Sequence, residues 1–164
     1  MTPEPRWLEL ARNYIGVREL PGAATAPVLQ RWLADANAWW ADDETPWCGL
    51  FPRTLLAQCN YETPKAWYRA RAWLDWGLEL PGPLVGCVTI YERGAAGHVN
   101  FTIGRTRIGT LLGLGGNQGN AVRISSFLPT RVLGHRWPRE AVGLIPWPTL
   151  PAFAYTAPVS QGEA

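Results

Sequence analysis

The feature that most constrains the fold is a change of pattern at Pro83. Before it, apolar residues recur at helical spacing; after it, β-branched and aromatic residues form short runs separated by glycines. Helices that precede strands along a chain favour an α+β fold, in which the helices pack on an antiparallel sheet. At 164 residues the chain is long enough for one such domain with a sizeable core.

Four segments before Pro83 are expected to be helical, because their apolar residues share one face and caps or glycines bound them. They are residues 7–15, 25–37 with Thr25 as N-cap, 45–59, and 67–76. Five segments after it are expected to be strands: residues 85–91, 98–103, 108–114, 122–127 and 141–145. The domain is therefore placed at 1–145, and the Pro-rich segment 146–164 is expected to be an extended or frayed tail.

Composition excludes several classes of protein. Ten Trp and only 17% charged residues disfavour disorder, and three Cys are too few for a disulfide scaffold. Neither a CxxC nor an HxxxH pair is present, so no metal site is expected. The net charge is only +2 and the arginines are scattered, which disfavours nucleic-acid binding. No apolar 20-mer predicts integral membrane association, and the N-terminal residues do not resemble a signal peptide.

Nucleophilic catalysis requires a nucleophile with a base in reach, and the chain offers few candidates for either. Of the two histidines, His98 opens a predicted strand, whereas His135 lies between Gly134 and Pro138 in what reads as a surface turn. His98 is therefore the better base. Its strand would also carry Asn100 on the same face.

Of the three cysteines, Cys48 has the most reactive context. It lies at the expected start of the third helix, where unpaired N–H groups and the helix dipole lower the pKa of a thiol. Cys59, about three turns later, is expected to be a buried helix residue. Cys87 is expected within a strand, packing as a small apolar side chain.

A residue that orients His98 can be sought by strand register. If segments 98–103 and 108–114 form a hairpin, His98 faces Gly115, and Asn117 is its diagonal neighbour on the same face. Asn100 is the rival for this role. The segment LGGNQGN can also be a plain Gly/Asn turn without any catalytic part.

Three segments in order, ETPWCGLF, GHVNFTIG and LGLGGNQGN, resemble the CHAP/NlpC-type cysteine peptidoglycan hydrolases. The similarity extends over about residues 5–145. It implies a papain-like fold in which Cys48 is the nucleophile, His98 the base and Asn117 the orienting residue, with no cofactor. Many relatives carry a carboxylate two positions before that Asn, where this chain has Gly115. The resemblance implies that the substrate is peptidoglycan. The bond cut would be the one that a muramoyl–alanine amidase cleaves or the one that a D,L-endopeptidase cleaves.

Several residues around Cys48 qualify this interpretation. Pro52 within the third helix would remove a backbone hydrogen bond unless it falls in the first turn. The acidic residues 42–44 are interpreted as partners of the helix dipole rather than as Ca²⁺ ligands.

Most Trp are expected in the core, namely Trp7, Trp32, Trp73 and Trp76. Trp39, Trp40 and Trp47 are assigned to a substrate groove, together with Gln118.

Two alternatives to an enzyme remain: a non-catalytic module that binds cell wall or glycan, and a virion or secretion-apparatus component that keeps the fold. Without a visible signal peptide, an enzyme would be made in the cytoplasm and reach the wall or periplasm by release or delivery. A phage lysin, a tail-associated hydrolase and a delivered effector all fit that requirement.

Overall fold

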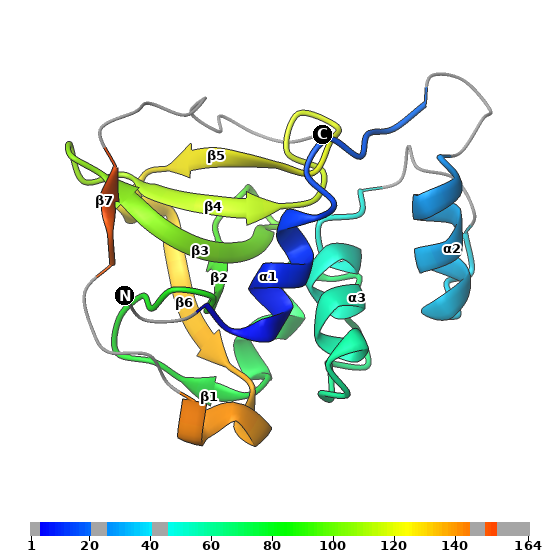
Figure 1. The fold of residues 1–164 in the computed structure, drawn as a ribbon, viewed down its shortest axis with the longest axis horizontal. Coiled ribbons are helices and arrows are strands. Elements are labelled where there is room, and N and C mark those ends of the chain that lie inside the picture. Colours follow the sequence, from blue (N-terminus) through cyan, green and yellow to red (C-terminus); the bar gives the residue numbers. More distant parts are fainter. Residues whose placement is uncertain (1–3, 21–25, 41–45, 145–149, 154–164) are drawn as a thin grey trace.

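The computed structural model describes residues 4–20, 26–40, 46–144 and 150–153, and it has the expected α+β architecture (Figure 1). The helices are α1 (Arg6–Arg12), α2 (Pro27–Asp35), α3 (Leu50–Gln58) and the 3₁₀ segments η1 (Ala70–Asp75), η2 (Pro129–Arg131) and η3 (Arg139–Leu144). The strands are β1 (Leu78–Glu79), β2 (Val88–Tyr91), β3 (His98–Thr106), β4 (Leu111–Gly115), β5 (Arg123–Phe127), β6 (Val132–Trp137) and β7 (Ala152–Phe153).

The described strands form one curled sheet in the order β1-β6-β2-β3-β4-β5, with β7 beside β3. All pairings are antiparallel except that of β7. The ring of Tyr91 on β2 stacks on that of Phe127 on β5, with centroids 4.4 Å apart, although β3 and β4 lie between these strands. In a flat sheet, strands three positions apart would be separated by about 14 Å. The sheet therefore curls so that this face is concave.

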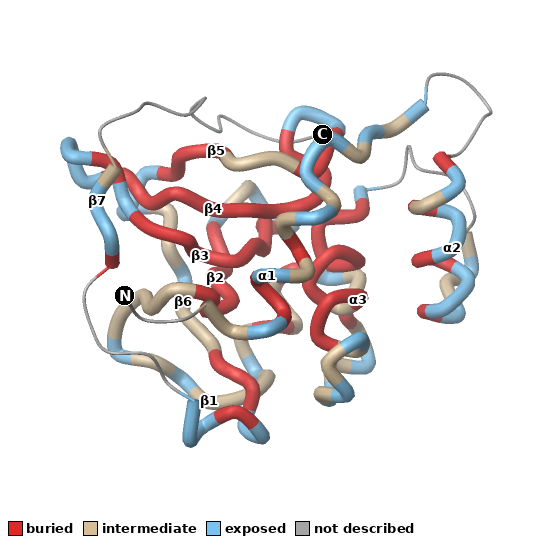
Figure 2. The backbone as a smooth tube through the Cα atoms, in the orientation of Figure 1, coloured by how far each residue is buried: buried red, intermediate tan, exposed pale blue. Residues whose placement is uncertain are grey.

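The two faces of the sheet differ in chemistry. The convex face is apolar and packs on the helices: the ring of Phe51 on α3 lies 5.9 Å from that of Phe101 on β3, and α1 packs beside α3. The concave face carries polar side chains next to the rings of Tyr91 and Phe127. The central strands that bear it are largely buried (Figure 2). The buried polar residues of this face are Thr89, His98, Asn100 and Thr102. Buried polar groups need partners, so this face must contain an internal hydrogen-bond network.

The first helices match the sequence expectations in position but differ at their starts. The N-cap of α2 is Ala26 rather than Thr25, which lies outside the described residues. The third helix begins at Leu50, not near residue 45. Pro52 is consequently its third residue, where a backbone N–H has no intrahelical acceptor, so the proline costs no hydrogen bond. The segment expected as a fourth helix is a 3₁₀ helix, η1.

The strand expected at residues 141–145 is wrong, because residues 139–144 form the 3₁₀ segment η3. The last long strand comes earlier, as β6, in the stretch interpreted above as a turn. Glycine is typical of turns, but Gly134 lies within β6. Its lack of a side chain leaves space for Leu74, whose Cδ2 lies 3.0 Å from the position that a Cβ would take. The sheet therefore has seven strands in the described residues instead of about five.

The only described piece of the expected tail, residues 150–153, joins the domain. Leu150 is buried, and Ala152 and Phe153 pair with Arg105 and Thr106 of β3. The ring of Phe153 lies over Gly104, at a place that a Cβ would occupy. The remaining tail residues lie outside the described part of the chain.

The expected core tryptophans Trp7, Trp32 and Trp73 are buried, and Trp76 is half-buried against the core. No helix in the described ranges has the length and apolar character needed to cross a lipid bilayer.

Candidate active site

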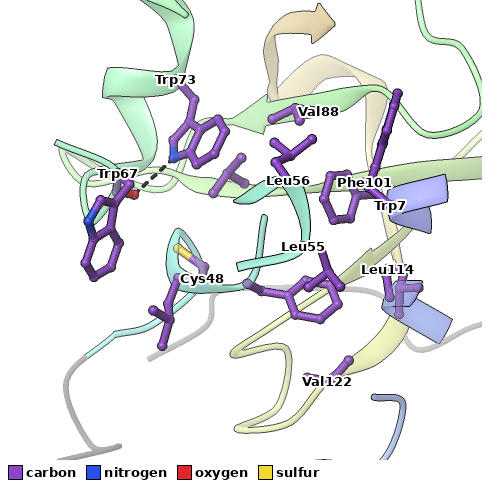
Figure 3. Close-up of a cluster of buried hydrophobic side chains, with 14 of the residues drawn as sticks. Trp7, Cys48, Leu55, Leu56, Trp67, Trp73, Val88, Phe101, Leu114 and Val122 are labelled. Carbon is purple, nitrogen blue, oxygen red and sulfur yellow. Dashed lines mark hydrogen bonds between the residues drawn. The ribbon is translucent and has the colours of Figure 1, made fainter. Parts of the chain in front are cut away.

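Cys48 lies in the turn that leads into α3, two residues before its first residue, Leu50. Its side chain is almost fully buried, near Trp67 and Trp73 (Figure 3). The next residue, Gly49, packs so closely on the carbonyl oxygen of Trp67 that a Cβ would collide with it. That carbonyl is held in turn by the indole N–H of Trp73, which donates to it at 3.0 Å. The backbone of the Cys48 turn is thus fixed against the segment before η1.

A cavity of about 540 Å³ opens beside Cys48. Its lining includes Gly97, the residue that precedes His98, so the cavity joins the turn of Cys48 to the start of β3. Gly97 has a φ of 93°, which favours glycine, and a Cβ there would stand 3.1 Å from the carbonyl oxygen of Tyr91. One residue from each of the two expected catalytic segments, Cys48 and Gly97, therefore lines the same cavity.

His98 is the first residue of β3 and is fully buried on the concave face. Its ring stacks on Phe127 with centroids 5.4 Å apart and an interplanar angle of 12°, and it also contacts the ring of Tyr91. These two aromatic neighbours restrict the rotation of the imidazole. The orientation of its nitrogens is therefore set by packing as well as by hydrogen bonds.

Gln118 determines which nitrogen of His98 carries the proton. The Nε2 amide of Gln118 donates to the carbonyl oxygens of Gly113 at 3.1 Å and Arg123 at 2.7 Å, which fixes the orientation of the amide. Its Oε1 then lies 3.0 Å from Nε2 of His98 and also accepts from Nδ2 of Asn100 at 3.0 Å. Because an amide oxygen can only accept, Nε2 of His98 is the protonated nitrogen. In the neutral ring, Nδ1 is therefore the basic nitrogen.

Glycines of β4 make room for this amide. A Cβ at Gly113 would overlap the side chain of Asn100, and a Cβ at Gly115 would overlap that of Gln118. The space above Gly115 is thus taken by the Gln118 amide, which contacts the imidazole of His98.

The residue that the structure shows hydrogen-bonded to His98 is Gln118, which directly follows the expected Asn117. The register also differs: Phe101 pairs with Leu114 and Thr102 with Gly113, two residues beyond the expected alignment. Asn117 follows β4 as a buried residue with a φ of 54°. This left-handed turn directs the chain back so that Gln118, the next residue, meets His98. Asn100, the expected rival, donates a hydrogen bond to the same Gln118 oxygen.

The three tryptophans assigned to a groove have separate places. Trp39 and Trp40 line the cavity, and Trp39 is 72% exposed, with its ring edge-on to Tyr68 at 4.4 Å. Trp47 is buried and does not line the cavity; its indole N–H donates to Oε1 of Glu19 at 2.7 Å. Gln118, assigned to the substrate, is likewise buried within the protein.

No cluster of three or more potential metal ligands is found among the described residues. The acidic residues 42–44, interpreted above as partners of the helix dipole, lie outside the described part of the chain.

Sequence reasoning missed a Cys–His pair on the concave face, Cys87 and His135. Nδ1 of His135 lies 2.9 Å from Oγ1 of Thr89 and 3.9 Å from Sγ of Cys87, and Thr89 also hydrogen-bonds to Thr102 at 2.6 Å. His135 is therefore a half-buried strand residue rather than a surface-turn residue. Burial lowers its pKa to about 4, and burial also raises the pKa of the fully buried Cys87 thiol. Near neutral pH both groups are uncharged, as expected of structural side chains.

Cys59, expected to be buried within a helix, is the half-buried C-cap of α3. Desolvation by burial raises the pKa of its thiol.

Comparison with known proteins gives no assignment: no protein-family model matches the chain, and no curated protein was found to match it.

Proposed function

We propose that this protein is a papain-like cysteine hydrolase that cleaves an amide bond in peptidoglycan. Cys48 is the nucleophile, His98 is the base, and Gln118 takes the orienting role first assigned to Asn117. The observation that carries the proposal is the hydrogen bond from Nε2 of His98 to Oε1 of Gln118. It leaves Nδ1 as the basic nitrogen of a histidine that directly follows a residue of the Cys48 cavity.

The reaction then follows from these groups. Nδ1 of His98 removes the proton of the Cys48 thiol, and the thiolate sulfur attacks the amide carbonyl carbon. As the C–N bond of the resulting tetrahedral intermediate breaks, the imidazolium returns the proton to the leaving amine. Water, deprotonated by the same imidazole, attacks the thioester and releases the acid together with the Cys48 thiol. Throughout, Gln118 holds the ring without adding a negative charge.

Peptidoglycan as the substrate rests on the resemblance of the segments around Cys48, His98 and Gln118 to cell-wall hydrolases. The exposed ring of Trp39 offers a surface on which a sugar or peptide can stack. The bond cut is that of a muramoyl–alanine amidase or of a D,L-endopeptidase. The enzyme would act at the wall or periplasm as a lysin, a tail-associated hydrolase or a delivered effector.

Digestion of purified sacculi tests the proposal. Wild type, Cys48→Ala and the matched control Cys87→Ala are incubated with sacculi, and the released muropeptides are analysed by mass spectrometry. We expect products from wild type and Cys87→Ala but not from Cys48→Ala. Equal release by Cys48→Ala would contradict the mechanism. The masses of the products identify the bond that is cut.

The exposed Trp39 also favours a second candidate, a non-catalytic module that binds wall glycan. That candidate predicts co-sedimentation with sacculi that Trp39→Ala abolishes and Cys48→Ala does not alter, with no turnover by wild type.

A further inference from the structure

The cavity beside Cys48 combines an aromatic wall with positive charge. Three arginines line it, Arg69, Arg71 and Arg93, and none of the described residues that line it is acidic. We propose that this site selects amide substrates that carry a free carboxylate next to the bond that is cut, and that Arg69 is the principal contact of that carboxylate. The inference rests on the proposed function and specifies the substrate that the site would accept.

Arg71 supports the cavity wall rather than the substrate. Its Nε donates to the carbonyl oxygen of Ala95 at 3.0 Å, and its Nη2 donates to that of Gly94 at 2.9 Å. The residues that it holds belong to the loop between β2 and β3, which ends at Gly97 immediately before His98. Arg71 is thus a positioning residue that joins the start of η1 to the approach of the base.

Arg69 is placed to meet a ligand. It is exposed, and its guanidinium carbon lies 5.7 Å from the centroid of the Tyr68 ring. Neither Arg69 nor Arg71 forms an ion pair with another residue in the described part of the chain. A guanidinium held against an aromatic ring keeps its N–H edge for a carboxylate, which it can bind with two parallel hydrogen bonds.

The rest of the lining fits an uncharged part of the same ligand. Trp39 contacts both Trp40 and Tyr68 edge-on, at 4.6 and 4.4 Å, so the aromatic side chains brace one another. Such a surface binds apolar groups and sugar faces, whereas positive charge in a hollow raises the local concentration of anions. A neutral peptide would contact only the aromatic surface. A ligand with a carboxylate close to its scissile amide would contact the aromatic surface and also the positive charge.

A pair of probes that differ in charge alone tests this. Soluble muropeptides with free carboxylates are compared with the same muropeptides after their carboxylates are converted to carboxamides. Turnover by wild type gives kcat/KM for each form, and calorimetry with Cys48→Ala gives Kd without turnover. Both measurements are repeated with Arg69→Gln and with Arg107→Gln, an exposed arginine in the turn after β3 that serves as the matched control.

We expect wild type and Cys48→Ala to favour the carboxylate form by about tenfold to hundredfold, as charge-assisted hydrogen bonds do. Arg69→Gln should reduce that preference to less than about threefold, and Arg107→Gln should retain it; Arg69→Lys should fall between, because it keeps the charge but loses the paired geometry. The preference should also shrink as salt is raised, because the site is open to solvent.

Equal affinity for the two forms, or an unchanged preference in Arg69→Gln, would overturn the inference. The same data separate it from the proposed function. Selective binding of the carboxylate form without any cleavage supports the anion site and contradicts the hydrolase. Cleavage of both forms at equal rates supports the hydrolase and contradicts the anion site.

Discussion

The concave face of the sheet carries two histidines whose surroundings differ. His98 lies between aromatic rings, directs Nε2 to an amide oxygen, and follows a residue of the cavity that Cys48 lines. His135 lies 3.9 Å from the thiol of Cys87, but that thiol is fully buried, and the hydroxyl of Thr89 hydrogen-bonds to the imidazole. A thiol close to an imidazole is therefore not a sufficient sign of catalysis. The cavity residue that precedes it and its fixed tautomer make His98 the better candidate for a base.

The largest expected effect separates the two histidines. His98→Ala should lower kcat for muropeptide hydrolysis by about a hundredfold to ten-thousandfold, because it removes the proposed general base. His135→Ala should change kcat by less than about threefold, since His135 does not line the cavity. Steady-state kinetics, with circular dichroism to verify folding, measures both. A similar loss of kcat in the two variants would contradict the distinction.

The thiols should differ next in reactivity. Cys48, which lines the cavity and is the proposed nucleophile, should react with iodoacetamide below pH 8 at least about a hundredfold faster than Cys87. Cys87 is fully buried and its pKa is raised by desolvation, so it should react only when the protein unfolds. Mass spectrometry of peptides from samples quenched over time gives each rate. Faster labelling of Cys87 in native protein would reverse the comparison.

A smaller effect distinguishes Gln118 from Asn117. Gln118→Leu removes the acceptor for Nε2 of His98 and should lower kcat by about tenfold to hundredfold, with little change in KM. Asn117→Gly suits the left-handed φ of 54° and leaves Gln118 in the chain, so kcat should fall by less than about threefold. If Asn117→Gly proves the more damaging of the two, the orienting role returns to Asn117.

The smallest effect is on stability and concerns His135. Its pKa is lowered to about 4 in the folded protein, so between pH 6.5 and 4 the unfolded chain binds more protons than the folded one. The free energy of unfolding should therefore fall as the pH drops through this window. Since the ring is only partly buried, solvent screening limits the loss to about 1–2 kcal/mol. Urea unfolding at pH 7 and pH 4 measures it, and His135→Gln should lose less stability over the same interval.

Sequence reasoning selected Cys48 and His98 as candidates because the chain has so few thiols and imidazoles. It assigned Gln118 to the substrate and could not place it against His98, because that contact depends on two features that composition does not show. One is the register of β3 and β4, which lies two residues from the simplest hairpin. The other is the left-handed conformation of Asn117, which turns the following side chain toward the imidazole.

The order of helical and strand patterns along the sequence was enough to predict the α+β class. It was not enough to predict the short and irregular strands. Strand β6 contains a glycine and ends before a proline, both of which are typical of turns, yet Leu74 fills the space beside that glycine. Strand β7 is only two residues long, and no periodicity can be detected over such a length. Tertiary packing, rather than local sequence pattern, determines that these segments are strands.

The pairing of β7 with β3 has a practical consequence for protein engineering. By composition, the Pro-rich end of the chain is where a purification tag or a truncation would be placed. Yet β7 pairs with Arg105 and Thr106, beyond the last residue of β3 that β2 pairs with, and so covers an otherwise open strand edge. Removing it would leave that edge free to associate with other chains, on the same strand that begins with His98.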